Sequence, residues 1–310
     1  MSTGTRIPEV LQVERHGYLF GTPISHSMSP LLHQTVYDNL GLKWAQFPLD
    51  SKDMNLFLQL IKHPKFYGAS VTMPHKVAIL QHLDGLTQEG ASVGAVNTVF
   101  LQEDSTGKRC LIGTNTDVIG IRDAFAYNAD PAKFHDRPAL VIGGGGAARS
   151  AIYALRTWMK ASAIYLINRD SDEVRAVIDE CTAQGFGDSL VHVATVSQAE
   201  QLEGVGAIIA CVPNFSPVSE SEKEARQVLE CFLHKKAHKG AILEMCYHPT
   251  PWTEIAEISQ AAGWQVILGT EALIYQGLEQ DRFWTGKEVY QLPVEKVQQA
   301  IARKLSEARL

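Results

Sequence analysis

The stretch ALVIGGGGAARSAIYAL combines glycine and other small residues in a spacing that could bind phosphate groups. Gly143, Gly145 and Ala148 form the pattern G-x-G-x-x-A directly after an apolar run and directly before a helical pattern. The first glycine permits a tight turn, the second lets backbone approach a pyrophosphate, and the small third residue lets helix and strand pack closely. The N–H groups that open the new helix, at Gly146 and Ala147, would hold the phosphates. This stretch therefore predicts a dinucleotide-binding site.

A second polar group ends the next strand-like run, about twenty residues beyond the glycines, where such a site reads the adenosine ribose. It consists of Asn168, Arg169 and Asp170. An acidic residue here accepts hydrogen bonds from the 2'-hydroxyl of NAD and repels the 2'-phosphate of NADP. Arg169 could stack on adenine or pair with a phosphate, which leaves the cofactor open on this evidence alone. Asp170, or Asp172 beside it, could also cap the helix that follows.

Hydroxyl groups gather in the segment GTPISHSMSP, between a predicted strand and a predicted helix. Ser27 and Ser29 lie close to the helix start, where two hydroxyl donors suit a carboxylate ligand. Ser29 followed by Pro30 is also typical of a helix beginning. We therefore expect Ser29 to cap this helix whether or not it binds a ligand.

Three further polar clusters follow predicted strands in the first half of the chain. The segment SVTMPHK places Thr72 and Lys76 just past a strand, with a proline between them that fixes the turn. The segments GAVNTV and GTNTDVIG surround Asn97 and Asp117 with turn-forming residues. Such surroundings indicate a fixed geometry for the amide and the carboxylate.

The elements that must position these residues alternate between short apolar runs and helical patterns, which is typical of βαβ units and a parallel sheet. In the first half we predict strands at 17–20, 45–48 and 68–72, helices at 30–40 and 54–61, and an antiparallel pair at 95–102 and 109–113. A helix at 120–127 and the loop NADPAKFHDRP come next. We therefore place a domain boundary near residue 123.

The pattern restarts at residue 138. We predict strands at 139–142 and 163–167, helices at 147–158 and 172–184, and further strands in the runs VHVA, AIIACV, GAILEM and WQVILG. The prediction is an α/β protein of two domains. A substrate-binding and catalytic domain with a mixed sheet covers 1–122 and is completed by helices in 275–310, and a Rossmann-type, doubly wound dinucleotide-binding domain covers 123–274.

Composition narrows the classes of partner. The chain has 310 residues, is 45% hydrophobic and carries a formal net charge of -6. This composition excludes disorder, and the charge gives no electrostatic reason to expect a nucleic-acid or anionic-membrane partner. The five cysteines are scattered and form no C-x-x-C motif, so neither a disulfide framework nor a zinc site is predicted from them. His234 and His238 have no Glu between them, so they do not predict a metal site either. We expect a cytoplasmic protein with small-molecule substrates, as a monomer or a dimer.

Taken in order, these clusters resemble the shikimate/quinate dehydrogenase family. The likeness covers nearly the whole chain through GTPISHSMSP, VTMPHK, GAVNTV, GTNTDVIG, GGGGAAR, EMCYHPTPWT and GTEALIYQG, and its wording is closest to the fungal quinate dehydrogenases. The resemblance implies that Ser27, Ser29 and Tyr247 bind the substrate carboxylate. It also implies that Thr72, Asn97 and Gln276 bind ring hydroxyls. Lys76 and Asp117 match the catalytic pair of the family.

Two departures from the family pattern stand out. Ser70 occupies a position where many members have Asn. At the ribose site, NADP-using members resemble N-R-T/S-x-x-K/R, whereas this chain has Asp170 in place of the hydroxyl and Glu173 in place of the second cation. The second departure favours NAD.

The resemblance implies oxidation of the C3 hydroxyl of quinate, and of shikimate, to the 3-dehydro product by hydride transfer to NAD. Lys76 would take the hydroxyl proton, titrating together with Asp117, which also suits the C4 hydroxyl. A hinge motion between the domains is expected. Two alternatives remain: an NADP-linked shikimate dehydrogenase working in the reductive, biosynthetic direction, and a non-catalytic quinate sensor, against which the intact Lys76, Asp117 and glycine turn argue.

Overall fold

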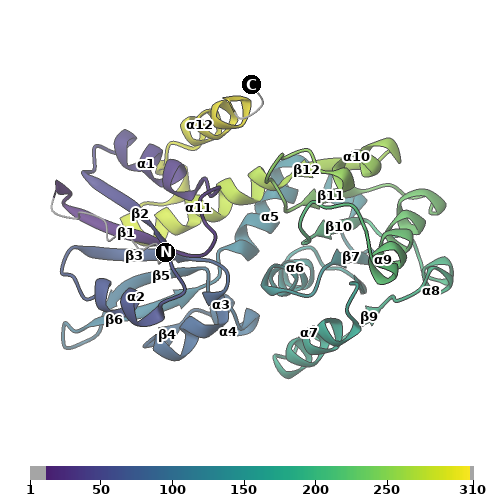
Figure 1. The fold of residues 1–310 in the computed structure, drawn as a ribbon, viewed down its shortest axis with the longest axis horizontal. Coiled ribbons are helices and arrows are strands. Elements are labelled where there is room, and N and C mark those ends of the chain that lie inside the picture. Colours follow the sequence, from purple (N-terminus) through teal and green to yellow (C-terminus); the bar gives the residue numbers. More distant parts are fainter. Residues whose placement is uncertain (1–11, 308–310) are drawn as a thin grey trace. The chain divides into compact units, whose positions relative to one another are not determined.

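The computed structural model describes residues 12–307. The chain divides into two compact units, one ending at Thr116 and resuming at Gln276, the other comprising Asp117–Tyr275 (Figure 1). The boundaries predicted from the sequence, 122/123 and 274/275, lie within a few residues of these. The second unit begins with helix α5 (Asp117–Asn128), because this helix packs against other elements of that unit. The Pro-rich loop also lies inside that unit, where Phe134 is buried in the core.

The first unit holds a six-stranded mixed sheet. Its elements are β1 (Arg15–Gly21), β2 (Trp44–Asp50), β3 (Phe66–Val71), β4 (Gly85–Leu86), β5 (Thr98–Glu103), β6 (Arg109–Thr114), α1 (Ser29–Asn39), α2 (Met54–Leu60), α3 (His75–Ala78), α4 (Gln88–Val93), α12 (Val294–Glu307) and the later part of α11 (Gly269–Thr285). The strand order is β2-β1-β3-β5-β6-β4. Strands β1, β2 and β3 are parallel, and β5 runs antiparallel to both β3 and β6, as predicted for the hairpin.

The second unit holds a six-stranded parallel sheet. Its elements, besides α5 and the start of α11, are β7 (Ala139–Ile142), β8 (Ile164–Ile167), β9 (Leu190–His192), β10 (Ala207–Ala210), β11 (Ala241–Glu244), β12 (Gln265–Leu268), α6 (Gly146–Thr157), α7 (Ser171–Ala183), α8 (Val196–Gln201), α9 (Glu220–Glu230) and α10 (Glu254–Ala261). The strand order β12-β11-β10-β7-β8-β9 is that of a doubly wound dinucleotide-binding sheet. This confirms the predicted fold class.

Side chains that alternate between the two faces of the parallel sheet form two hydrophobic cores, one on each face. Val141 of β7 faces a cluster with α5, α6 and α7, whereas Leu140 and Ile142 face a cluster with α8, α9 and α10. Because strands buried on both faces read as continuous apolar runs, they were visible in the sequence. Helices α8, α9 and α10 were not predicted. Among the described residues, no helix is long and apolar enough to cross a membrane.

Candidate functional site

The polar clusters of the first unit meet at one edge of its sheet. Ser27 and Ser29 follow the carboxyl end of β1, and Thr72 and Lys76 follow that of its parallel neighbour β3. The two loops are joined by backbone hydrogen bonds, at 2.9 Å from the Thr72 amide to the Phe20 carbonyl and at 2.9 Å from Thr22 to Met73. Carboxyl ends of neighbouring parallel strands lie together, which is why residues distant in sequence converge here.

Asn97 reaches the same edge because β5 is antiparallel to β3. Its side chain is buried, and its Oδ1 accepts hydrogen bonds from the Thr116 amide and the Thr98 hydroxyl, both at 2.8 Å. Its Nδ2 donates to the Thr116 hydroxyl at 3.0 Å and to Gln276 Oε1 at 3.2 Å. The predicted ring-hydroxyl ligands Asn97 and Gln276 are therefore in direct contact.

Ser29 does not cap α1, contrary to our expectation. The helix begins at Ser29 itself, and its hydroxyl donates to Gln46 Oε1 at 3.1 Å. Gln46 Nε2 in turn donates to the hydroxyl of Ser70 at 2.9 Å. The Ser27 hydroxyl accepts from the Ser29 amide at 3.3 Å. A tertiary partner on β2 thus replaces the local cap, and Ser70 belongs to the same hydrogen-bonded group as the predicted carboxylate ligand.

Lys76 lies on the short helix α3, and the neighbouring residue His75 anchors this helix to the rest of the unit. The His75 ring is buried, stacks on Phe20 with centroids 4.0 Å apart, and its Nε2 lies 3.0 Å from the Ser51 carbonyl oxygen. The Lys76 carbonyl accepts from the Val96 amide at 2.7 Å. The backbone of the candidate base is therefore tied to the residue that precedes Asn97.

Two predicted substrate-site residues belong to the second unit. Asp117 opens α5 directly after Thr116, and Tyr247 lies in the loop after β11. The loop that carries Tyr247 is anchored by Glu244, whose carboxylate accepts from the Cys246 amide at 3.0 Å and from the Thr253 hydroxyl at 3.0 Å. Glu244 is only 1% exposed. Its burial raises its pKa to about 7, and the two hydrogen bonds oppose this shift.

Glu244 should make stability depend on pH. Its pKa is about 7 in the folded chain against 4.5 ordinarily, so the folded state binds the proton more tightly and the free energy of unfolding falls as pH rises between these values. We expect Glu244→Gln, which imitates the protonated group, to gain about 2.5 kcal/mol relative to the parent protein between pH 5 and pH 8.5. Urea unfolding at both pH values measures this gain. The matched change Glu257→Gln, at an exposed position of α10, should show none, and an equal effect of Glu244→Gln at both pH values would refute the prediction.

The glycine turn of the second unit has the geometry that phosphate binding requires. Gly143 has φ of +117°, and a Cβ there would lie 3.0 Å from the Cys211 carbonyl oxygen, so glycine is required. A Cβ at Gly145 or Gly146 would meet nothing within 4 Å. Gly145 is the N-cap of α6, and no side chain caps the first amides of the helix at this position. This cradle fits the pyrophosphate of a dinucleotide, with Ala147 in the first turn and Ala148 buried in the core.

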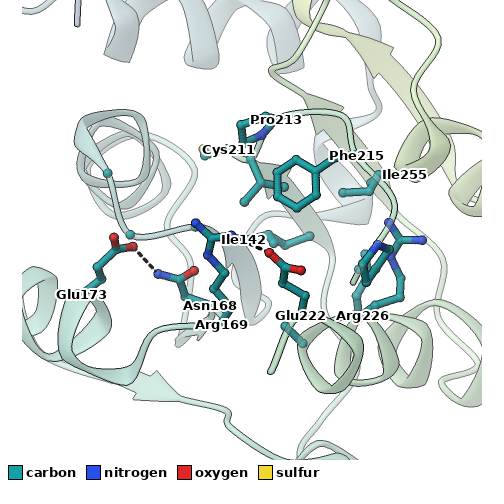
Figure 2. Close-up of a pocket in the computed structure, with 17 residues that line it drawn as sticks. Ile142, Asn168, Arg169, Glu173, Cys211, Pro213, Phe215, Glu222, Arg226 and Ile255 are labelled. Carbon is teal, nitrogen blue, oxygen red and sulfur yellow. Dashed lines mark hydrogen bonds and ion pairs between the residues drawn. The ribbon is translucent and has the colours of Figure 1, made fainter. Parts of the chain in front are cut away.

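A pocket of about 230 Å³ adjoins this turn at the carboxyl ends of β7, β8 and β10. Because β7 and β10 flank the point where the strand order reverses, this is where a doubly wound sheet binds its ligand. Figure 2 shows Asn168, Arg169 and Glu222 among its lining residues, with Glu173 beside Asn168. The Asn168 amide donates to Glu173 at 2.6 Å, and the Arg169 guanidinium forms an ion pair with Glu222 at 2.5 Å.

Asp170 serves as the cap of α7. Its Oδ1 accepts from the amides of Asp172 at 2.9 Å and of Glu173 at 3.3 Å. Among the described residues the pocket is lined by Glu173 and Glu222 but not by Asp170. The carboxylates that line the pocket are therefore those of Glu173 and of Glu222 on α9, rather than that of Asp170.

Glu222 was not predicted as a site residue, although the sequence contains a signal for it. Ser219 and Glu222 form a capping box at the start of α9, in the pattern S-x-x-E. Glu222 accepts from the Ser219 and Val218 amides, which together with Arg169 lower its pKa to about 2. It is therefore a carboxylate at neutral pH. Among residues 12–307 no group of three His, Cys, Asp or Glu could hold a metal ion.

Comparison with known proteins identifies the family of this chain. Residues 19–99 match the shikimate dehydrogenase substrate binding domain. A quinate dehydrogenase of Emericella nidulans is 47% identical over 97% of this chain and 98% of its own length. The chain belongs to the shikimate/quinate dehydrogenase family. It is accordingly an oxidoreductase that uses a nicotinamide dinucleotide.

Solved structures of this family share the fold. A quinate dehydrogenase from Corynebacterium glutamicum in complex with NAD has a TM-score of 0.76 at 22% identity, covering 94% of this chain and 99% of that one. A shikimate 5-dehydrogenase from Thermus thermophilus in complex with NADP(H) and shikimate has a TM-score of 0.71 at 26% identity, covering 93% and 99%. Proteins that share this fold have therefore been solved with either dinucleotide.

Proposed function

We propose that this chain is an NAD-dependent quinate dehydrogenase, which oxidises the C3 hydroxyl of quinate, and of shikimate, to the 3-dehydro product. The observation that carries the choice of cofactor is the pairing of both guanidinium groups in the nucleotide pocket. Arg169 is paired with Glu222, and Arg226 with Glu254 at 2.6 Å. The 47% identical quinate dehydrogenase supports the choice of substrate.

The charges around the pocket favour a ribose without a 2'-phosphate. Glu173 and Glu222 both line the pocket, and Glu222 occupies the guanidinium that a phosphate would need. A 2'-phosphate would therefore meet two carboxylates and displace an ion pair. The 2'-hydroxyl of NAD needs only an acceptor, which Glu173 or Asn168 supplies.

One group of residues would bind the carboxylate of the substrate, and another group would bind the hydroxyls of its ring. Ser27 and Ser29 would hold the carboxylate, and Thr72, Asn97 and Gln276 would hold ring hydroxyls. Ser29 and Asn97 are both nearly inaccessible to solvent, at 5% and 3% exposed. Their hydrogen-bonding groups are therefore oriented before substrate arrives, which lowers the entropy that binding must remove.

Oxidation of a secondary alcohol needs a group that takes the hydroxyl proton. Lys76 is the candidate base, and Asp117 is the second residue of the predicted catalytic pair. The bound nicotinamide supplies the hydride acceptor. The ties of Lys76 to Val96 and of His75 to Ser51 hold the short helix in place, so that the lysine is presented from a fixed backbone.

Initial rates with quinate and shikimate, each with NAD and NADP, test the proposal. We expect the highest kcat/KM with quinate and NAD. Highest kcat/KM with shikimate and NADP would establish instead the NADP-linked shikimate dehydrogenase. Absence of dinucleotide reduction with all four combinations, together with quinate binding by calorimetry, would establish a sensor.

The carboxylate site gives a further prediction. Because carboxylate contacts are nearly equal in the ground state and the transition state, Ser27→Ala with Ser29→Ala should mainly raise the KM for quinate, by about tenfold or more, with a smaller change in kcat. Steady-state kinetics measure both quantities. A double variant that kept its KM and lost kcat would assign the two hydroxyls another role. Ser25→Ala, an exposed serine of the same loop, is the matched control.

A further inference from the structure

A buried hydrogen-bonded chain runs behind the substrate edge of the first unit. It begins at Asp281 of α11, whose Oδ2 lies 2.9 Å from Nδ1 of His33 on α1. His33 Nε2 lies 3.1 Å from Gln280 Oε1, and the Ser70 hydroxyl donates to the same Oε1 at 3.0 Å. His33 and Asp281 are fully inaccessible to solvent, and Gln280 is 1% exposed. None of these three residues is assigned a role in the proposed reaction.

Gln280 is the junction of this chain because its amide contacts both halves of the substrate site. Its Nε2 donates to the Thr98 hydroxyl at 2.8 Å and to the Asn97 carbonyl oxygen at 3.2 Å. Through Ser70 it reaches Gln46 and Ser29, the predicted carboxylate side. Through Thr98 it reaches the side chain of Asn97, the predicted ring-hydroxyl side.

Hydrogen-bond accounting allows the Gln280 amide only one orientation. The Asn97 carbonyl oxygen can only accept, so the amide nitrogen of Gln280 must face it. Gln280 Oε1 then faces His33, and His33 Nε2 must carry a hydrogen to donate. The opposite amide orientation would set Oε1 against the Asn97 carbonyl oxygen. The hydroxyl hydrogens of Ser70 and Thr98 are fixed in consequence, toward Gln280 and toward Asn97 Oδ1.

The pair of His33 and Asp281 is a costly way to stabilise a core. Asp281 is fully buried, which raises the pKa of its carboxyl group, whereas His33 and the hydroxyl of Tyr37 oppose this shift. Replacement of such pairs by apolar residues is often neutral or stabilising, because two polar groups must be desolvated. Stability alone therefore does not account for this pair, whereas orientation of the Gln280 amide does.

We propose that Gln280, oriented by His33 and Asp281, is a positioning residue of the substrate site, which fixes the hydrogen-bond directions of Ser29 and Asn97 for the two ends of the substrate. The proposal rests on the function proposed above. It extends that function, because Gln280 acts through Ser70 and Thr98 rather than by touching substrate.

Kinetics of three variants test the proposal. Gln280→Met keeps the length of the side chain but removes every hydrogen bond, so the KM for quinate should rise about tenfold or more while the KM for NAD stays within about twofold. Asp281→Asn keeps a partner for His33 Nδ1 and leaves Nε2 protonated, so its KM for quinate should stay within about threefold. Thr285→Val, which removes a hydrogen bond to the Asp281 carbonyl on the same helix, is the control.

Nitrogen-15 NMR of the His33 side chain tests the orientation without activity. We expect a hydrogen on Nε2 in the unmodified protein at neutral pH. A His33 protonated only on Nδ1 would overturn the proposal, and so would a Gln280→Met variant with unchanged KM for quinate, or an equal rise of KM in all three variants. If Gln280→Met does not fold, the NMR result and the kinetics of Asp281→Asn decide. If the unmodified protein fails to oxidise quinate, the proposed function falls, and the NMR result still decides whether Gln280 is oriented in this way.

Discussion

Replacement of Lys76 by alanine is expected to lower kcat with quinate and NAD by about 10² to 10⁴-fold, the usual contribution of a positioned acid or base. The KM for quinate should change much less, because the contacts to the carboxylate and the ring hydroxyls are made by other residues. The half-buried Lys76 is tied through its backbone to the edge where Asn97 and Thr72 also lie. Steady-state kinetics, with dinucleotide reduction followed by absorbance, measure both quantities.

The control for this prediction is Lys62→Ala, which removes an exposed lysine of the same unit. Its kcat should equal that of the unmodified protein. A Lys76→Ala variant that kept kcat within about threefold would exclude Lys76 as the base, since general acid and base catalysis contributes far more than that. Asp117 would then be the remaining candidate of the predicted pair.

The second large effect concerns the cofactor. A unit charge pair about 4 Å apart costs roughly 4 kcal/mol at an effective dielectric of about 20, and solvent exposure reduces this to about 2 to 3 kcal/mol. We therefore expect NAD to be preferred over NADP by about 30- to 150-fold in kcat/KM. Replacing both Glu173 and Glu222 by Gln should lower this preference to below about tenfold, because it removes two carboxylates and releases Arg169 from its ion pair.

The choice of Gln separates charge from structure. The amide oxygen that Glu222→Gln introduces could still accept from the Ser219 and Val218 amides, so the start of α9 is kept while the charge is lost. Glu220→Gln removes the same charge from an exposed position of α9 that does not line the pocket and should leave the cofactor ratio unchanged. Asp170→Ser keeps a helix cap and measures what the charge of Asp170 adds. Equal use of both cofactors by the unmodified protein would refute the assignment.

Sequence patterns predicted those parts of the molecule that depend on near neighbours in the chain. The apolar strands of the parallel sheet, the tight turn at Gly143 and the helix after it each follow from local residue types. The polar residues at the ends of β1 and β3 were also recognisable, because turn-forming residues follow apolar runs there. The roles of these residues came from the resemblance to a family and remain predictions.

Tertiary structure decided how the polar groups are paired. The partner of Ser29 is Gln46 rather than its own helix, and that of Arg169 is Glu222, which lies 53 positions along the chain on a helix that was not predicted. His33 and Asp281 are separated by 248 positions. A side-chain hydrogen bond depends on a distance near 3 Å and on direction, and no periodicity or spacing encodes either one. Only the packing of α1 and α11 against the sheet brings such groups together in the first unit.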